Sequence, residues 1–202
     1  SVTSIGVNAF SYCGSLTNIT VSENNLNYSS KDGVLLNKDK TTLICYPCGK
    51  IGGYTIPEGV MSIGDSAFSG CSSLTSVTIP GSVTSIGANA FDWCSSLTSV
   101  TIPESVTSIG ESAFYGCSSL TSITIPGSVA SIGANAFYYC CSLTSITISE
   151  SVTSIGDWAF FDCSSLTSIT IPASVTSIGD LAFSKCSSLE DVYYTGTEEE
   201  WN

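Results

Sequence analysis

The sequence predicts a mainly β solenoid built from coils about 23 residues long, with short strands on both sides of each coil. One apolar phrase, Val-x-x-Ile-Gly-x-x-Ala-Phe-x-x-Cys-x-x-Leu-x-x-Val/Ile-x-Ile, occurs seven times in the 202 residues. A repeat of this length indicates stacked coils, because each coil can bury its inward face only against the coils above and below it. From the second copy onward, anchor cysteines follow one another every 23 residues: Cys71, Cys94, Cys117, Cys140, Cys163 and Cys186.

Two short strands and one turn are expected in each coil. Residues 97–102 alternate apolar and polar side chains and end at Pro103, which is typical of a strand. Residues 83–86 form a second, shorter strand that stops at Gly87, where the missing Cβ permits a positive φ. Residues 89–94 then predict one short helical or 3₁₀ turn. The longer strand is expected to recur at Leu16, Leu74, Leu120, Leu143, Leu166 and Leu189.

Two irregular segments flank the regular coils of what we interpret as a single domain, residues 1–202. Within the first, residues 34–36 and 41–44 read as two strands around a polar turn, a projecting hairpin. Because the chain opens in the middle of a repeat, we expect it to be part of a longer protein. The predicted parts are a first partial coil (1–21), an irregular hairpin insertion (22–57), regular coils (58–192) and a truncated, acidic and aromatic C-terminal cap (193–202).

Composition narrows the classes of partner. The net charge is −12, from 17 acidic residues and five lysines, with neither arginine nor histidine. Nucleic acids and anionic membranes are recognised by clustered Lys and Arg, so neither is expected as a partner. No apolar run reaches the roughly 18 to 20 residues that span a bilayer, so direct membrane insertion is not expected either.

The motif Ser-Ile-Gly-x-x-Ala-Phe-x-x-Cys-x-x-Leu-x-x-Ile-x-Ile-Pro closely resembles the BspA-like leucine-rich repeats of the Treponema pallidum type. Residues 28–35 with Tyr46-Pro47 resemble the hairpin module of that family, and residues 193–197 with Trp201 its usual ending. The resemblance implies a right-handed, curved solenoid on or released from cells, with a role in adhesion. It also implies host or cell-surface proteins as partners, with glycans as a second class of partner, for a chain that is a monomer or part of a larger chain.

Ten cysteines raise the question of disulfides. Cys13 and the six anchor cysteines share one repeat position, so stacking places neighbours about 4.8 Å apart with parallel Cβ vectors. A disulfide instead needs Cβ atoms about 3.8 Å apart and directed at each other. We therefore expect a ladder of buried free thiols. For Cys45 and Cys48, the one Cys-x-x-Cys pair, free structural thiols, a local disulfide and a catalytic role remain open.

Two repeated surfaces are candidates for binding. On the longer strands, regularly spaced serine and threonine hydroxyls could contact a partner or could simply keep the strands soluble. The aromatic residues near the turns could be contact points or could wedge between coils. The strand residues are Ser76, Thr78, Ser99, Thr101, Ser122, Thr124, Ser145, Thr147, Ser168 and Thr170. The aromatic candidates are Trp93, Tyr115, Tyr138, Tyr139 and Trp158.

Catalysis is not expected. No histidine is present, and the acids Asp65, Glu111 and Asp157 recur two coils apart, roughly 10 Å by strand spacing. No catalytic, cofactor-binding or metal-binding residue is therefore assigned. The favoured hypothesis is an extracellular or cell-surface, adhesin-like binding module, and the alternative is a passive spacer within a larger surface protein. Asn18 and Asn27 lie in N-glycosylation sequons, which matter only in a eukaryotic source.

Overall fold

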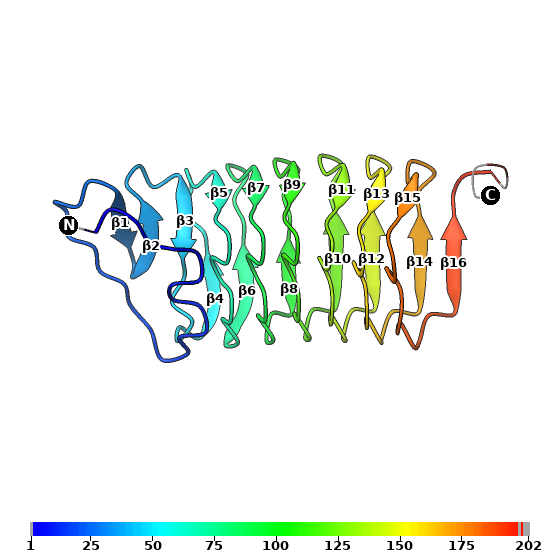
Figure 1. Ribbon diagram of the computed structural model, residues 1–202, viewed down its shortest axis with the longest axis horizontal. Helices are drawn as coiled ribbons and strands as arrows, with labels where there is room; N and C mark the ends of the chain where they lie inside the picture. Colours follow the sequence, from blue (N-terminus) through cyan, green and yellow to red (C-terminus); the bar gives the residue numbers. More distant parts are fainter. Residues whose placement is uncertain (1, 198, 200–202) are drawn as a thin grey trace.

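The computed structural model describes residues 2–197 and residue 199 and confirms the solenoid, a stack of coils running from one end of the molecule to the other (Figure 1). Each regular coil contributes one two-residue strand and one longer strand. The short strands are β5 (Ser62–Ile63), β7 (Ser85–Ile86), β9 (Ser108–Ile109), β11 (Ser131–Ile132), β13 (Ser154–Ile155) and β15 (Ser177–Ile178). The longer strands are β4 (Gly52–Thr55), β6 (Leu74–Thr78), β8 (Ser99–Thr101), β10 (Ser122–Ile125), β12 (Ser145–Ile148), β14 (Ser168–Ile171) and β16 (Asp191–Tyr194).

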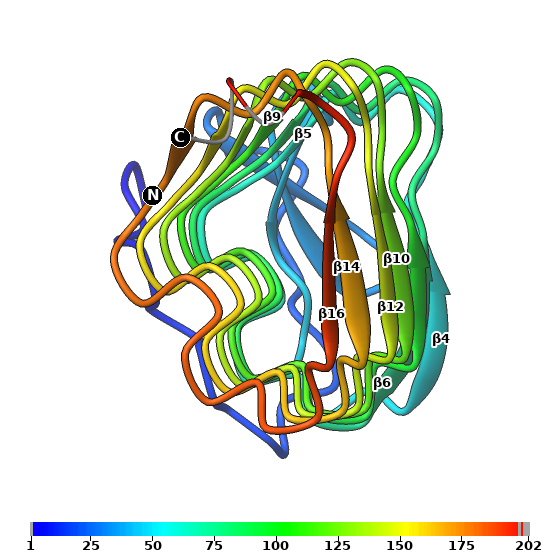
Figure 2. The same ribbon diagram turned by 90° about the vertical axis from the view of Figure 1, so that its right-hand side faces the viewer.

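Most strands of successive coils pair in parallel and in register, and the ladders are interrupted between β8 and β10, between β9 and β11, and between β12 and β14. Ser122 pairs with Ser145 and Ser131 with Ser154, so each residue lies beside its equivalent in the next coil. The same register holds for the other pairs between regular coils. Viewed along the stack, the longer strands form one side of the coil, while the turns that lead from the short strands to the longer ones follow the other side (Figure 2).

The turns are not continuous helices. Between Asn89 and Cys94 the N–H groups alternate: those of Asn89, Phe91 and Trp93 donate to the next coil, at 2.7 to 2.9 Å. The N–H groups of Asp92 and Cys94 instead donate three residues back, both at 3.1 Å. The predicted turn is thus present as separate hydrogen-bonded turns, since every second N–H group is used to join the coils.

Aromatic rings form the centre of the core. Tyr46, Phe68, Phe91, Phe114, Phe137, Phe160 and Phe183 follow one another as a single stack through the coils. Centroids of successive phenylalanines lie 4.9 to 5.5 Å apart with interplanar angles of 3 to 14°. Truncating one such buried ring to alanine costs about 3 to 5 kcal/mol in typical cores, so this stack is a main source of stability.

The hairpin does not project, which corrects the sequence interpretation. Strands β1 (Tyr28–Lys31), β2 (Val34–Asn37) and β3 (Thr42–Cys45) are antiparallel neighbours, but β3 also pairs in parallel with β5. The three strands therefore extend the short-strand sheet at its N-terminal end (Figure 1). An open sheet edge exposes unpaired backbone groups. Here β2 pairs with the edge of β3, and β1 pairs with β2.

The N-terminal segment also differs from expectation, because no strand forms at Leu16. It keeps local turn bonds of the repeat, such as Leu16 N–H to the Cys13 carbonyl at 2.8 Å. However, the Leu16 carbonyl accepts from Gly49 at 2.7 Å and Ile19 N–H donates to Gly33 at 2.8 Å. These backbone groups are thus used by the inserted segment and cannot continue a strand ladder. Both sequon asparagines of the N-terminal region are exposed.

At the C-terminal end, Tyr193 and Tyr194 continue the template as part of β16, paired with Thr170 and Ile171 of β14. Tyr194 packs, half-buried, against the core at the position that isoleucine has in β14. Most of the acidic ending and Trp201 of the predicted cap lie outside the described residues. Within the part of the chain that is described, no helix has the length and apolar character needed to cross a membrane.

Candidate binding surfaces

Ten hydroxyl side chains share the outer side of the longer strands. Because side chains of a strand alternate between its two faces, Ser76 and Thr78 are exposed while Val77 between them is buried. In-register pairing repeats this arrangement in the neighbouring coils. All ten side chains are exposed. We call this set the hydroxyl face: Ser76, Thr78, Ser99, Thr101, Ser122, Thr124, Ser145, Thr147, Ser168 and Thr170.

Three other ranks of hydroxyls in the coil have structural partners. Ser105 Oγ donates to the Val83 carbonyl at 2.6 Å, and Thr98 Oγ1 to the Thr75 carbonyl at 3.2 Å. Equivalent bonds to the preceding coil recur along three ranks of serine and threonine. By contrast, the hydroxyl face makes no side-chain hydrogen bond to any other described residue. Its hydroxyls are free to donate to and accept from a partner.

The aromatic residues gather on the opposite, turn side of the coils. Tyr115 and Tyr138 stack at 4.8 Å with an interplanar angle of 7°, and Tyr138 stacks on Phe161 at 4.6 Å. Tyr139 meets Tyr138 edge-on at 4.6 Å. Lys185 Nζ lies 5.0 Å from the centre of the Phe161 ring. We call this group, with Trp93 tilted against Tyr115 at 5.9 Å, the aromatic stripe.

Large and small residues alternate at one position of this turn side, where every residue has a positive φ. Trp93 has φ 52° and its equivalent in the next coil, Gly116, has φ 67°. A Cβ on Gly116 would lie 2.9 Å from Cδ2 of the Trp93 ring, so only glycine fits beneath the indole. Tyr12 covers Gly70 in the same way, since a Cβ on Gly70 would lie 2.7 Å from Cδ1 of the Tyr12 ring. Glycine at this position therefore makes room for the aromatic ring of the preceding coil.

Tyr12 also attaches the N-terminal segment to the stack. Its Oη donates to Asp92 Oδ2 at 2.6 Å, across 80 residues of sequence, and Ser69 Oγ donates to the same oxygen at 3.2 Å. Burial and the neighbouring Asp92 carboxylate raise the pKa of Tyr12 to about 12. Burial likewise raises the pKa of Asp92.

The predicted binding residues thus fall on two separate surfaces. The ten strand residues among them are brought together on the hydroxyl face, and Trp93, Tyr115, Tyr138 and Tyr139 in the aromatic stripe. Trp158 joins neither: it is 43% exposed at an earlier corner of its coil, and no ring contact links it to another described aromatic residue.

The predicted ladder of buried thiols extends from Cys71 to Cys186. Each sulfur also has a hydrogen-bonding role that the sequence did not reveal. Cys94 Sγ donates to the Phe68 carbonyl of the preceding coil at 3.2 Å, and the later rungs repeat this bond at 3.1 to 3.2 Å. Burial raises the pKa of Cys94, Cys117 and Cys140, which keeps them as thiols that can donate.

The first rung of the ladder is Cys48, not Cys13. Cys13 is exposed in the N-terminal segment, whereas Cys48 is buried beside Cys71. The signal in the sequence is Tyr46-x-Cys48, which matches Phe68-x-x-Cys71 with one residue fewer. Because of that missing residue, the constant 23-residue spacing of the anchor cysteines does not indicate Cys48 as a member of the ladder.

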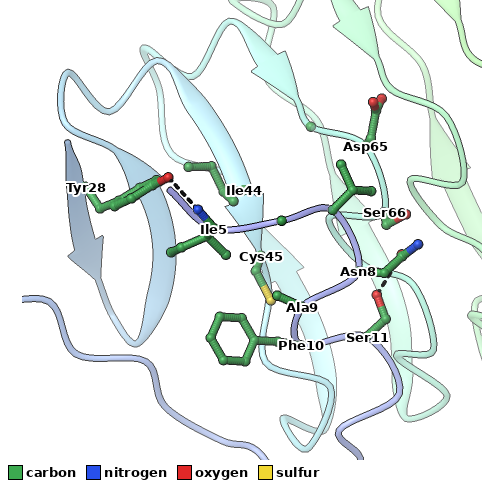
Figure 3. Close-up of a pocket in the computed structure, with 13 residues that line it drawn as sticks. Ile5, Asn8, Ala9, Phe10, Ser11, Tyr28, Ile44, Cys45, Asp65 and Ser66 are labelled. Carbon is green, nitrogen blue, oxygen red and sulfur yellow. Dashed lines mark hydrogen bonds between the residues drawn. The ribbon is translucent and has the colours of Figure 1, made fainter. Parts of the chain in front are cut away.

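A cavity of about 270 Å³ lies between the N-terminal segment and the first coils (Figure 3). Most polar groups at its wall are used within the chain: Ile5 N–H donates to Tyr28 Oη at 2.9 Å, and Ser11 Oγ to Asn8 Oδ1 at 3.0 Å. The buried Ser66 Oγ has no partner among the described residues. The cavity forms where the N-terminal segment departs from the stacking register, and its wall gathers no set of groups suited to acid–base chemistry.

Two of the three repeated acids bond the turn of the following coil. Asp65 Oδ1 accepts from Ala88 N–H at 2.9 Å, and Asp157 Oδ1 from Asp180 N–H at 2.8 Å. Each carboxylate therefore satisfies a backbone donor of the following coil. Across residues 2–197 and 199, no group of three or more Cys, Asp or Glu side chains is placed to hold a metal ion.

Comparison with known proteins identifies this architecture. The model of the family described as "BspA type Leucine rich repeat region" matches the chain in six copies, over residues 1–33, 42–140 and 84–201. The chain belongs to the BspA-type leucine-rich repeat family. A search of curated proteins finds no match.

Solved bacterial structures agree with this assignment. A leucine-rich cell surface protein from Faecalibacterium prausnitzii is 36% identical over 100% of this chain, with a TM-score of 0.70. A leucine-rich repeat protein from Eubacterium ventriosum is 33% identical over 92% of this chain, with a TM-score of 0.83. The chain covers 48% and 50% of these two proteins, so it spans about half of their length.

Proposed function

We propose that this BspA-type chain is a non-catalytic binding module of an extracellular or cell-surface protein, and that it holds a protein partner on the hydroxyl face. The observation that carries the proposal is the set of ten exposed hydroxyls without partners in the described chain, aligned on the longer strands, in a coil where three other ranks of serine and threonine bond the preceding coil. The description of the Faecalibacterium prausnitzii relative as a cell surface protein supports the location.

Charge and ring geometry indicate the kind of partner. With a net charge of −12, the chain repels acidic surfaces and nucleic acid and favours neutral or basic proteins. In the aromatic stripe, the faces of Tyr115, Tyr138 and Phe161 are covered by one another. Few ring faces of the aromatic stripe remain for stacking against a sugar, which favours a protein over a glycan as the partner.

Lysine substitutions test the hydroxyl face directly. The unmodified chain, Ser99→Lys/Ser122→Lys and a control would be measured against a panel of immobilised extracellular matrix proteins and a glycan array. The control, Ser108→Lys/Ser131→Lys, adds the same charges at exposed serines of the short strands. We expect binding to at least one matrix protein, weakened about tenfold or more by the first variant only, roughly 1.4 kcal/mol.

Other outcomes would contradict the proposal. Equal loss in both double variants would mean that charge, and not the hydroxyl face, controls binding. Binding to glycans alone would assign a different partner class. Blank arrays would favour the passive spacer, which the rigid stack of rings would also suit.

A further inference from the structure

The contact between Cys48 and Cys71 differs from the ordinary rungs of the thiol ladder. Their Sγ atoms lie 3.1 Å apart, closer than the contact distance of two sulfur atoms that share no bond. Both side chains are buried, Cys48 at 3% and Cys71 at 0% exposure. In the later rungs, the thiol instead donates to a phenylalanine carbonyl of the preceding coil at 3.1 to 3.2 Å.

The missing residue in the first coil explains the difference. Between Tyr46 and Cys48 lies one residue, whereas two separate Phe68 from Cys71. The carbonyl that Cys71 would use, that of Tyr46, is 3.7 Å from its sulfur, about half an ångström further than in other rungs. Cys48 reaches across and bonds the Ser69 carbonyl at 3.3 Å. The two sulfurs consequently face each other, unlike side chains stacked in strict register.

The other end of the ladder provides a comparison. Cys163 and Cys186 interact closely enough for the Cys163 thiol to lower the pKa of Cys186. Both nevertheless keep their carbonyl acceptors, at 3.2 and 3.1 Å. Only at the shortened coil is the usual acceptor displaced.

Cys48 is also the more reactive member of the first pair. The Cys71 S–H donates to Cys48 Sγ and lowers the pKa of Cys48 to about 7, while the same bond and burial raise the pKa of Cys71. Since the thiolate is the attacking species in exchange with disulfides, Cys48 is the expected nucleophile. Burial raises the pKa of neighbouring Cys45 to about 12, and its sulfur is directed at the Tyr46 carbonyl at 3.6 Å.

We propose that Cys48 and Cys71 form a disulfide when the chain folds in the presence of a low-molecular-weight disulfide, and that this bond fastens the hairpin end to the first regular coil. The Cys48 thiolate attacks one sulfur of the small disulfide, forms a mixed disulfide and releases one thiolate. Cys71 loses its proton to water, and its sulfur attacks Cys48 and releases the second thiolate. Two cysteine thiols are oxidised, and one small disulfide is reduced to two thiols.

Peptide mapping tests this in the unmodified chain. The protein would be refolded with reduced and oxidised glutathione, alkylated and cleaved after lysine and before aspartate without reduction. Cleavage at Lys50, Asp65 and Asp92 separates residues 41–50, which hold Cys45 and Cys48, from residues 65–91, which hold Cys71 alone. We expect these two peptides to be joined, with a loss of two hydrogen atoms, and fragmentation to place the bond at Cys48.

Matched variants complete the test. Cys45→Ser should retain the cross-link, and Cys48→Ser should abolish it. A bond between Cys45 and Cys48, or free thiols at Cys48 and Cys71 in the refolded protein, would overturn the proposal. A cross-link between Cys163 and Cys186 in equal yield would also overturn the proposal. Any pair of cysteines at an end of the ladder would then be oxidised, whether or not its coil is shortened.

Discussion

The regular coils and the N-terminal end use the same sequence elements with different results. In the regular coils a constant period places each phenylalanine, cysteine and hydroxyl beside its equivalent in the next coil. In residues 2–57 an insertion and a missing residue break that period, so Leu16 forms no strand and Cys13 lies outside the ladder. Constant spacing therefore repeats the same contacts from coil to coil, while a local departure from it creates a contact found at one place, such as that between Cys48 and Cys71.

The largest expected effect is on the ring stack in the middle of the regular coils. Phe114 is fully buried between two stacked rings, whereas Phe183 stacks on Phe160 alone and is half-buried. Phe114→Ala should lower the free energy of unfolding by about 3 to 5 kcal/mol, and Phe183→Ala by clearly less. Urea unfolding followed by circular dichroism would measure both. Equal losses would mean that the rings do not form one continuous stack.

A smaller effect is expected in the thiol ladder. Cys117→Val removes one of two donors to the buried Phe91 carbonyl: the Sγ bond at 3.2 Å is lost, and the Cys94 N–H bond at 3.1 Å remains. We expect a cost of about 0.5 to 1.5 kcal/mol. Cys13→Val, at an exposed thiol, should stay within about 0.5 kcal/mol of the unmodified chain. The same urea unfolding assay would measure the free energy of unfolding of both variants. If both variants lost equally little, the thiols would act only as small apolar groups.

The smallest and most local effect concerns alkaline pH at the N-terminal end. Burial raises the pKa of Tyr12, Tyr46 and Tyr54 from 10.0 to about 12. Between these values the unfolded state has already lost protons that the folded state retains, so stability is present below pH 10 and falls as the pH rises towards 12. Phenolate absorbance would follow the loss of the tyrosine protons, and unfolding midpoints measured from pH 10 to pH 12 would follow the fall in stability. In Tyr12→Phe the decline should be smaller, and an unchanged decline would exclude Tyr12 as a contributor.

The sequence was sufficient for the architecture because the period, the alternation in residues 97–102 and the glycine at each corner are local signals. It also located the hydroxyl face, since alternation determines which residues of a strand point outward. It could not show that β3 serves both the hairpin and the stack, because strand pairing depends on which edge is covered. The alternating turn bonds, the Trp93–Gly116 contact and the carbonyl partners of the thiols likewise depend on three-dimensional contacts between coils.

In-register stacking is the central claim, and distances between spin labels along the hydroxyl face test it most directly. In a chain whose exposed and half-buried Cys13, Cys45 and Cys141 are replaced by serine, a label at Thr78→Cys would be paired with one at Thr124→Cys, Thr147→Cys or Thr170→Cys. These positions lie two, three and four coils away, so electron paramagnetic resonance should give separations near 10, 14 and 19 Å, equal steps of about 4.8 Å. Distances that do not increase evenly with the number of coils would contradict the stack.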